Sequence, residues 1–181
     1  MISITEGVWR LDPEHSSVEF HVPNLYGLMT VKGHFSDYDG TLDLSARPAI
    51  ELTIAAGSLE TENERRDKHL RSADFFDVES HPQVRFESDS AKLAGERLKV
   101  RGHLHAAGHQ IPLDVDATLR EVDGRLEIEA GAVADQRELG MTFSPLGMVR
   151  APSKLIVRGR LLRTGRQDTP ATDDTALAGV R

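Results

Sequence analysis

The feature that most constrains this chain is an alternation of apolar and polar residues that recurs about eight times. In the first clear run, Val18, Phe20 and Val22 alternate with Glu19 and His21. Neighbouring side chains of a β-strand point to opposite faces, so such a run predicts a strand with one apolar and one polar face. Similar runs occupy residues 31–35, 50–54, 84–88, 98–104, 111–119, 126–130 and 155–161.

Short turn signals separate these runs and favour an antiparallel, all-β fold. Asp123-Gly124, between two alternating runs, is the strongest candidate for a two-residue hairpin. Asp39-Gly40, Gly95-Glu96 and Ala107-Gly108 are further turn candidates. Many half-polar strands with short connections predict a sandwich or a barrel, and a barrel leaves no exposed strand edges.

One segment departs from the alternation and predicts a helix over residues 62–73. Thr61 and Glu64 have the spacing of a capping box, in which the threonine caps the helix and the glutamate returns to its first amide. The helix is the most basic stretch of the chain. Such a charge run is most often a solvated helix face, although its arginines could also bind a polar head group.

Composition excludes several classes of protein. The net charge of −7 argues against nucleic-acid binding, and no run approaches the ~20 apolar residues of a membrane span. The absence of cysteine removes disulfides and thiolate sites. The start of the chain lacks the features of an export signal, so we expect a cytoplasmic protein. We expect one domain over 1–163 and a disordered tail over 164–181.

Motifs for catalysis and metal binding are weak. His103 and His105 share one strand face and could supply two metal ligands, but a third is missing and that face is the polar one. His15 and Ser16 are neighbours in an extended segment, so they point apart and do not form a nucleophile pair. Phosphate-binding glycine loops are absent. We therefore expect no catalytic residue, no metal site and no cofactor.

Several motifs are similar to those of one known family. Residues 66–88 resemble the central signature of the YceI-like family, in which Arg-Asp-x-His-Leu is followed by Asp-Phe-Phe-Asp, a proline and Phe-x-Ser. Residues 9–20 match the family opening, 31–35 and 100–104 look like its strand motifs, and 137–141 resemble its late element. Departures occur at residues 23–25, at 105–109 and at Leu139.

The resemblance implies a fold and a ligand that the alternation alone does not show. The fold is an extended, eight-stranded antiparallel, lipocalin-like β-barrel with one helix inserted between strands. The ligand is a long amphiphile, such as a polyisoprenoid, an isoprenoid quinone or a fatty-acid-like chain, in an apolar channel. The expected function is that of a non-enzymatic carrier, and a homodimer is plausible from the family alone.

The inward strand faces and the central segment supply the candidate site. The expected apolar channel consists of Phe20, Val22, Val31, Phe35, Leu52, Ile54, Leu70, Phe75, Phe76, Phe86, Leu104, Leu113, Val115, Met141, Phe143 and Met148. The candidates to meet a polar head group are His15, Arg66, His69, Arg71 and Arg137.

Two alternatives to a carrier stay open at the level of sequence. The first is an enzyme that acts on a bound isoprenoid-type lipid, with His15 or His69 as a general base facing the cavity. The second is a stress-related protein whose barrel is filled. The hydrophobic content of 39% is mostly aliphatic, and it could either fill a core or line a cavity.

Overall fold

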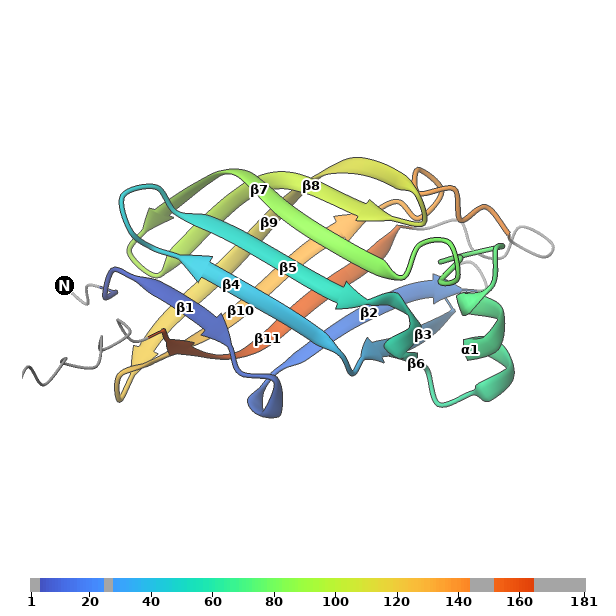
Figure 1. Cartoon of the computed structure of the whole chain (residues 1–181), viewed down its shortest axis with the longest axis horizontal. Coiled ribbons are helices and arrows are strands. Elements are labelled where there is room, and N and C mark those ends of the chain that lie inside the picture. The colour runs from blue at the N-terminus through green and yellow to red at the C-terminus, as the bar shows by residue number, and fades with distance from the viewer. Residues whose placement is uncertain (1–3, 25–27, 144–151, 165–181) are drawn as a thin grey trace, which may run out of the picture.

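The computed structural model describes residues 4–24, 28–143 and 152–164, which form one antiparallel β-sheet curled into a barrel (Figure 1). The predictions for residues 165–181 and for Met148 lie outside these ranges. The elements are β1 (Val8–Leu11), the 3-10 helix η1 (Pro13–His15), β2 (Ser17–Asn24), β3 (Met29–Phe35), β4 (Tyr38–Asp43), β5 (Ala49–Ala55), the 3-10 helix η3 (Ala56–Ser58), β6 (Leu59–Glu60), α1 (Glu64–Arg71), β7 (Gln83–Ala94), β8 (Arg97–Ala106), β9 (His109–Val122), β10 (Arg125–Ala134) and β11 (Ser153–Arg163).

Eleven strand segments build a closed barrel of eight strands. Both β1 and β2 pair with β11. On their other side, β1 pairs with β4 and β2 pairs with β3. The segments β5 and β6 in turn pair with β4 and β3. Three sets of consecutive segments, β1 with β2, β3 with β4, and β5 with β6, therefore each act as one interrupted strand of the barrel. The ring closes because β11 also pairs with β10, and the prediction of an eight-stranded antiparallel barrel is confirmed.

The connections follow the turn chemistry of the sequence, with one exception. Asp123 and Gly124 have φ values of 51° and 72°, the left-handed conformations that a type I′ hairpin requires, and they join β9 to β10. The prediction of a turn at Asp39-Gly40 is wrong, because both residues lie inside β4. A Cβ atom at Gly40 would lie 3.2 Å from Leu52 Cδ1, so this glycine allows a close approach of packed neighbours.

Helix α1 lies between β6 and β7, at the end of the barrel where β2 ends and β11 begins (Figure 1). The helix is shorter than the predicted span of residues 62–73, and the prediction of a cap at Thr61 is wrong. The N-cap is Asn63, whose Oδ1 accepts the backbone N–H of Arg66 at 3.0 Å. The Thr61 hydroxyl, which would accept a backbone N–H in a capping box, instead donates to the buried carboxylate of Asp67.

The end of the barrel away from α1 is packed solid. We call this region the packed base, and its centre consists of Trp9, Leu98, Val100, Leu119 and Leu126, each at most 2% exposed. Close packing of this kind leaves no room for a ligand. Several inward residues of the other half, such as Phe35, Phe86 and Leu113, are 6–7% exposed, and a cavity lies among them. In the described residues, no helix is long and apolar enough to cross a bilayer.

Candidate ligand-binding cavity

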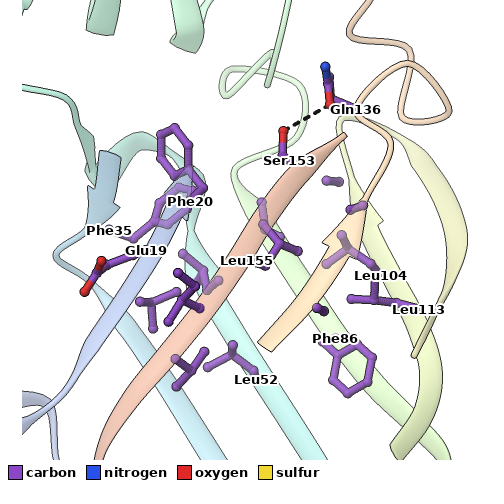
Figure 2. A pocket seen from close by; sticks show the side chains of 18 of the residues that line it. Glu19, Phe20, Phe35, Leu52, Phe86, Leu104, Leu113, Gln136, Ser153 and Leu155 are labelled. Carbon is purple, nitrogen blue, oxygen red and sulfur yellow. Dashed lines mark hydrogen bonds between the residues drawn. The ribbon is translucent and has the colours of Figure 1, made fainter. Parts of the chain in front are cut away.

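The hollow half of the barrel encloses a cavity of about 670 Å³. This volume is in the range of ~300–1,000 Å³ that is typical of small-molecule sites. Inward-facing side chains from most strands converge on it, among them Leu52, Phe86, Leu104, Leu113 and Leu155 (Figure 2). An entirely filled barrel is therefore not what the structure shows.

All of the expected channel residues within the described ranges line this cavity. They are Phe20, Val22, Val31, Phe35, Leu52, Ile54, Leu70, Phe75, Phe76, Phe86, Leu104, Leu113, Val115, Met141 and Phe143. The expectation also missed some lining residues, including Leu155, Val157, Ala130, Ala132 and Leu11. The alternation in residues 155–161 and 126–130 places several of these on the inward face. Applying the same pattern to every strand would therefore have predicted them.

Aromatic rings from β2, β3 and the segment after α1 form one side of the cavity. The centroids of the Phe20 and Phe35 rings are 5.4 Å apart, and the Phe76 ring meets Phe35 edge-on at 5.9 Å. Edge-to-face contacts at these distances are favourable for aromatic pairs. The residues that follow the helix are thereby fixed against the strands, and the polar residues of α1 are held at the end of the cavity.

The mouth of the cavity is built around His69. The His69 ring packs edge-on against Phe75 and Phe143, with centroids 5.1 Å and 4.6 Å away. Its Nε2 lies 2.7 Å from the Asp74 carboxylate, which orients the ring. All of these residues except Asp74 line the cavity. In this arrangement, the imidazole can contact a polar head group while the two phenylalanine rings contact the apolar chain next to it.

Arg66 reaches the cavity wall while it holds the helix in place. Its Nε and Nη2 donate to the hydroxyl and the carbonyl oxygen of Thr61, at 2.7 Å and 2.6 Å. Asp67, the neighbour of Arg66, accepts from the backbone N–H of Thr61 at 3.0 Å. These bonds explain the polar cluster in the central signature: it joins α1 to the segment that precedes it.

Arg137 lines the cavity as well and forms a close ion pair. Its guanidinium binds the Asp135 carboxylate, and this hydrogen bond lowers the pKa of Asp135 below its ordinary value. Next to this pair, the Ser153 hydroxyl donates to Gln136 Oε1 at 3.0 Å, which connects the start of β11 to the loop after β10 (Figure 2). The polar lining at this end is therefore held by mutual hydrogen bonds.

Two of the five expected head-group residues lie elsewhere. His15 belongs to η1 and does not line the cavity; its Nδ1 is 2.8 Å from Asp12 Oδ2. Arg71 also does not line the cavity, because its guanidinium donates to the backbone carbonyls of Gly57 and Leu59. The structure therefore does not bring these two residues to the cavity. Sequence proximity to the signature motifs did not reveal where the fold would place them.

The weak chemical motifs of the sequence have structural roles in the fold. The Ser16 hydroxyl accepts the backbone N–H of Arg160 at 3.2 Å, so it joins η1 to β11. Among the described residues no hydrogen bond joins His15 to Ser16, because the Ser16 hydroxyl is bonded to the backbone of Arg160. His103 lies on the outer face of β8, and its Nδ1 is 2.8 Å from Asp89.

The described strands form a closed eight-stranded antiparallel barrel with an apolar internal cavity, an architecture that can hold one small ligand. A family model described as a YceI-like domain matches residues 9–158, and the chain belongs to this family. The resemblance of the sequence motifs to the family is thus confirmed.

Relatives and solved structures agree with this assignment. The chain is 36% identical over 117 residues to a UPF0312 protein of Pectobacterium atrosepticum, an alignment that covers 61% of this chain and 60% of that protein's length. BcnA of Burkholderia cenocepacia has the same fold, with a TM-score of 0.75 and 16% identity over 83% of this chain and 98% of its own. A polyisoprenoid-binding domain from Saccharophagus degradans aligns with a TM-score of 0.70 and 10% identity, covering 88% of this chain and all of its own.

Proposed function

We propose that this protein is a non-enzymatic carrier of a long-chain amphiphile, with a polyisoprenoid or an isoprenoid quinone as the ligand class. The observation that carries the proposal is the composition of the cavity wall, which is mainly apolar and includes Arg66, His69 and Arg137 as well as Glu19 and Glu51. Such a wall suits a hydrocarbon chain with one polar terminus. The polyisoprenoid-binding description of the Saccharophagus degradans domain supports the choice of ligand class.

The size of the cavity supports useful affinity for such a ligand. If each chain carbon takes up about the ~30 Å³ that a water molecule occupies in the liquid, a cavity of about 670 Å³ holds roughly 20 carbons. Burial of ~15 of them contributes about 12 kcal/mol at ~0.8 kcal/mol per CH₂, before an association cost of at least ~4 kcal/mol. The remaining ~8 kcal/mol corresponds to a micromolar dissociation constant.

A cavity-filling substitution tests this proposal. Leu52 lines the cavity and is half-buried, so Leu52→Trp places the indole in the free space. Leu162 lies on β11, is 45% exposed and does not line the cavity, so Leu162→Trp is the matched control. Binding of an isoprenoid quinone with three isoprene units is measured by native mass spectrometry and by equilibrium titration, with thermal unfolding as the check of folding.

We expect micromolar or tighter binding by the natural sequence, at least a tenfold loss in Leu52→Trp, and no change in Leu162→Trp. A protein that binds neither isoprenoid quinones nor polyprenyl lipids contradicts the proposal. So does a folded Leu52→Trp variant with undiminished affinity, since the ligand would then lie outside the cavity.

One observation favours the alternative of an enzyme. His69 lines the cavity and is bonded to Asp74, the arrangement of an oriented general base. His69→Ala separates the two functions: turnover of a bound lipid that is lost in this variant, while binding is kept, would indicate catalysis. Under the carrier proposal no lipid is converted, and His69→Ala changes only affinity.

A further inference from the structure

The backbone ladder between β9 and β10 is incomplete on the side of the cavity, although the loop after β10 packs on the start of β9, where a Cβ at Gly140 would lie 2.6 Å from His109 Cε1. The ladder of these two strands ends at the pair Ala132 and Val115. Both strands continue beyond it, because β9 pairs with β8 as far as His109 and β10 pairs with β11 as far as Ala134. In the described part of the chain, residues 109–114 of β9 thus have a strand partner on one side only. We call this gap in the ladder the β9–β10 seam.

An outer groove lies directly behind the cavity at this seam. The groove has a volume of about 610 Å³ and is lined by residues of β9, β10 and β11. The groove and the cavity share lining residues on both sides of the wall: Leu113, Gly131, Ala132, Leu155 and Ile156. Only a thin wall of small and aliphatic groups therefore separates the interior from solvent at this place.

The residue types at the seam are those of an unpaired wall. Pro112 has no N–H to donate, and prolines inside strands are confined to edges and unpaired stretches. Gly131 leaves the groove open, since the nearest atom to a Cβ at this position would be the Leu155 carbonyl oxygen, 4.0 Å away. Val133 follows on the outer face and is 62% exposed. An apolar chain that passes here meets no buried charge, while the exposed Asp114, Asp116 and Lys154 line the groove outside.

The two ends of the cavity differ in the exit they offer to a long chain. The packed base blocks the far end, where Trp9 is 1% exposed and Leu98 and Leu119 are fully buried. A chain that enters at the mouth and is longer than the ~20 carbons the cavity holds must therefore fold back or leave sideways. The β9–β10 seam lies in the mouth half of the barrel, between the loop that carries Arg137 and the paired part of the ladder, which begins at Ala132 and Val115.

We propose that the β9–β10 seam is a lateral portal through which the tail of a long isoprenoid chain leaves the barrel, while its head group stays at the mouth. This inference rests on the carrier function proposed above. It makes the protein tolerant of chain length, because only the first carbons need to fit inside. It also assigns the outer groove as the place where the protruding tail lies.

A disulfide across the seam tests the portal. Because the natural sequence has no cysteine, the two introduced thiols can pair only with each other within the chain. Continuation of the β9–β10 register beyond Ala132 and Val115 would place Val133 opposite Asp114, and both are exposed. The variant Asp114→Cys/Val133→Cys, once oxidised, holds the seam closed. Its matched control is Thr118→Cys/Glu129→Cys, an exposed pair in the closed part of the same ladder.

Disulfide formation requires Cα atoms within ~7 Å, so it is verified by mass spectrometry. Where the disulfide does not form, a short bis-maleimide bridges the same two thiols and fills the seam. The probes are isoprenoid quinones with three and with ten isoprene units, bound to the oxidised or bridged protein. The disulfide form is measured again after reduction.

The natural sequence should bind both probes with affinities within about threefold of each other. Closing the seam should weaken binding of the ten-unit quinone at least tenfold, leave the three-unit quinone within twofold, and be reversed by reduction of the disulfide. The control pair should change neither. The portal is overturned if the closed protein keeps its affinity for the ten-unit chain, or if the natural sequence rejects that chain. If even the three-unit quinone fails to bind, the carrier function fails and the portal with it.

Discussion

The ring of Phe20 lies flat on the backbone of Gly33, its cross-strand partner: a Cβ atom at Gly33 would lie only 2.2 Å from Phe20 Cζ. A second glycine, Gly102 on β8, is covered by the Phe86 ring, with a Cβ-to-Cζ distance of 2.8 Å, and by the Glu87 carbonyl oxygen, which would lie 2.2 Å from the same Cβ. Both phenylalanines line the cavity. Each glycine thus lets a large ring lie against the wall instead of projecting into the space, which helps to keep this half of the barrel hollow.

Gly33→Ala should therefore push the Phe20 ring into the cavity. We expect a loss of stability of ~1–3 kcal/mol from the forced repacking, and weaker binding of an isoprenoid quinone because the cavity shrinks. Gly57→Ala is the control, since no atom lies within 4 Å of a Cβ there. Denaturant unfolding and equilibrium binding measure the two effects. Unchanged affinity in Gly33→Ala would show that the ligand does not use the space beside Phe20.

Two inward residues of β9 should separate stability from binding. Leu119 is fully buried in the packed base, so Leu119→Ala should cost ~2–5 kcal/mol of unfolding free energy and leave ligand affinity almost unchanged. Val115 lines the cavity and is half-buried, so Val115→Ala should cost less stability and change affinity more. Urea unfolding and quinone titration give both quantities. Equal effects of the two variants would contradict the division of the barrel into a solid and a hollow half.

The buried carboxylate of Asp67 should be essential to the position of α1. Asp67→Asn keeps the size of the side chain but removes the charge that accepts from the backbone and hydroxyl of Thr61. We expect a loss of ~1–3 kcal/mol, because hydrogen bonds to a charged buried group are strong and costly to disturb. Asp116→Asn, at an 83% exposed carboxylate, is the control. A cost no larger than that of the control would refute a structural role for this network.

Asp12 should make part of the stability depend on pH. Its hydrogen bond with His15 is the main cause that lowers the pKa of Asp12 below its ordinary 3.8, and the Glu14 N–H bond adds to it. A carboxyl group with a lowered native pKa stabilises the fold above its ordinary pKa, and this stabilisation is lost as the pH falls through the native value.

The variant Asp12→Asn should accordingly destabilise the protein at pH 7 and approach the stability of the natural sequence below pH 3.8. The amide oxygen can still cap η1, so the comparison isolates the charge. Denaturant unfolding across this pH range is the measurement. A difference that stays constant with pH would mean that the charge of Asp12 contributes nothing.

Much of the barrel was predictable because the face of a strand residue is decided locally. Alternation around Phe20, Leu52 and Leu113 is enough to place these side chains inside, whatever the neighbouring strands are. The Asp123-Gly124 hairpin follows from local turn chemistry for the same reason. Whether the inward residues fill or line the interior depends on the diameter and closure of the ring, which no single strand encodes.

The structure departs from the sequence-based expectations where distant partners compete for the same polar group. The Thr61 hydroxyl fits a helix cap by spacing, but Asp67 takes it and Asn63 caps the helix. Arg71 was expected at the mouth, but two backbone carbonyls bind it. The β9–β10 seam was invisible for a similar reason, since β9 has an unbroken alternation although its first residues lack a partner on one side.

The packed base has a consequence for how such a protein can change over generations. Residues such as Trp9 and Leu98 hold the barrel together without contacting the cavity. Substitutions in the cavity wall should therefore reduce the free energy of unfolding only slightly, and it is this stability that limits most sequence change. Under the proposed carrier function, ligand preference can diverge step by step through the cavity wall, while selection for folding acts mainly on the packed base.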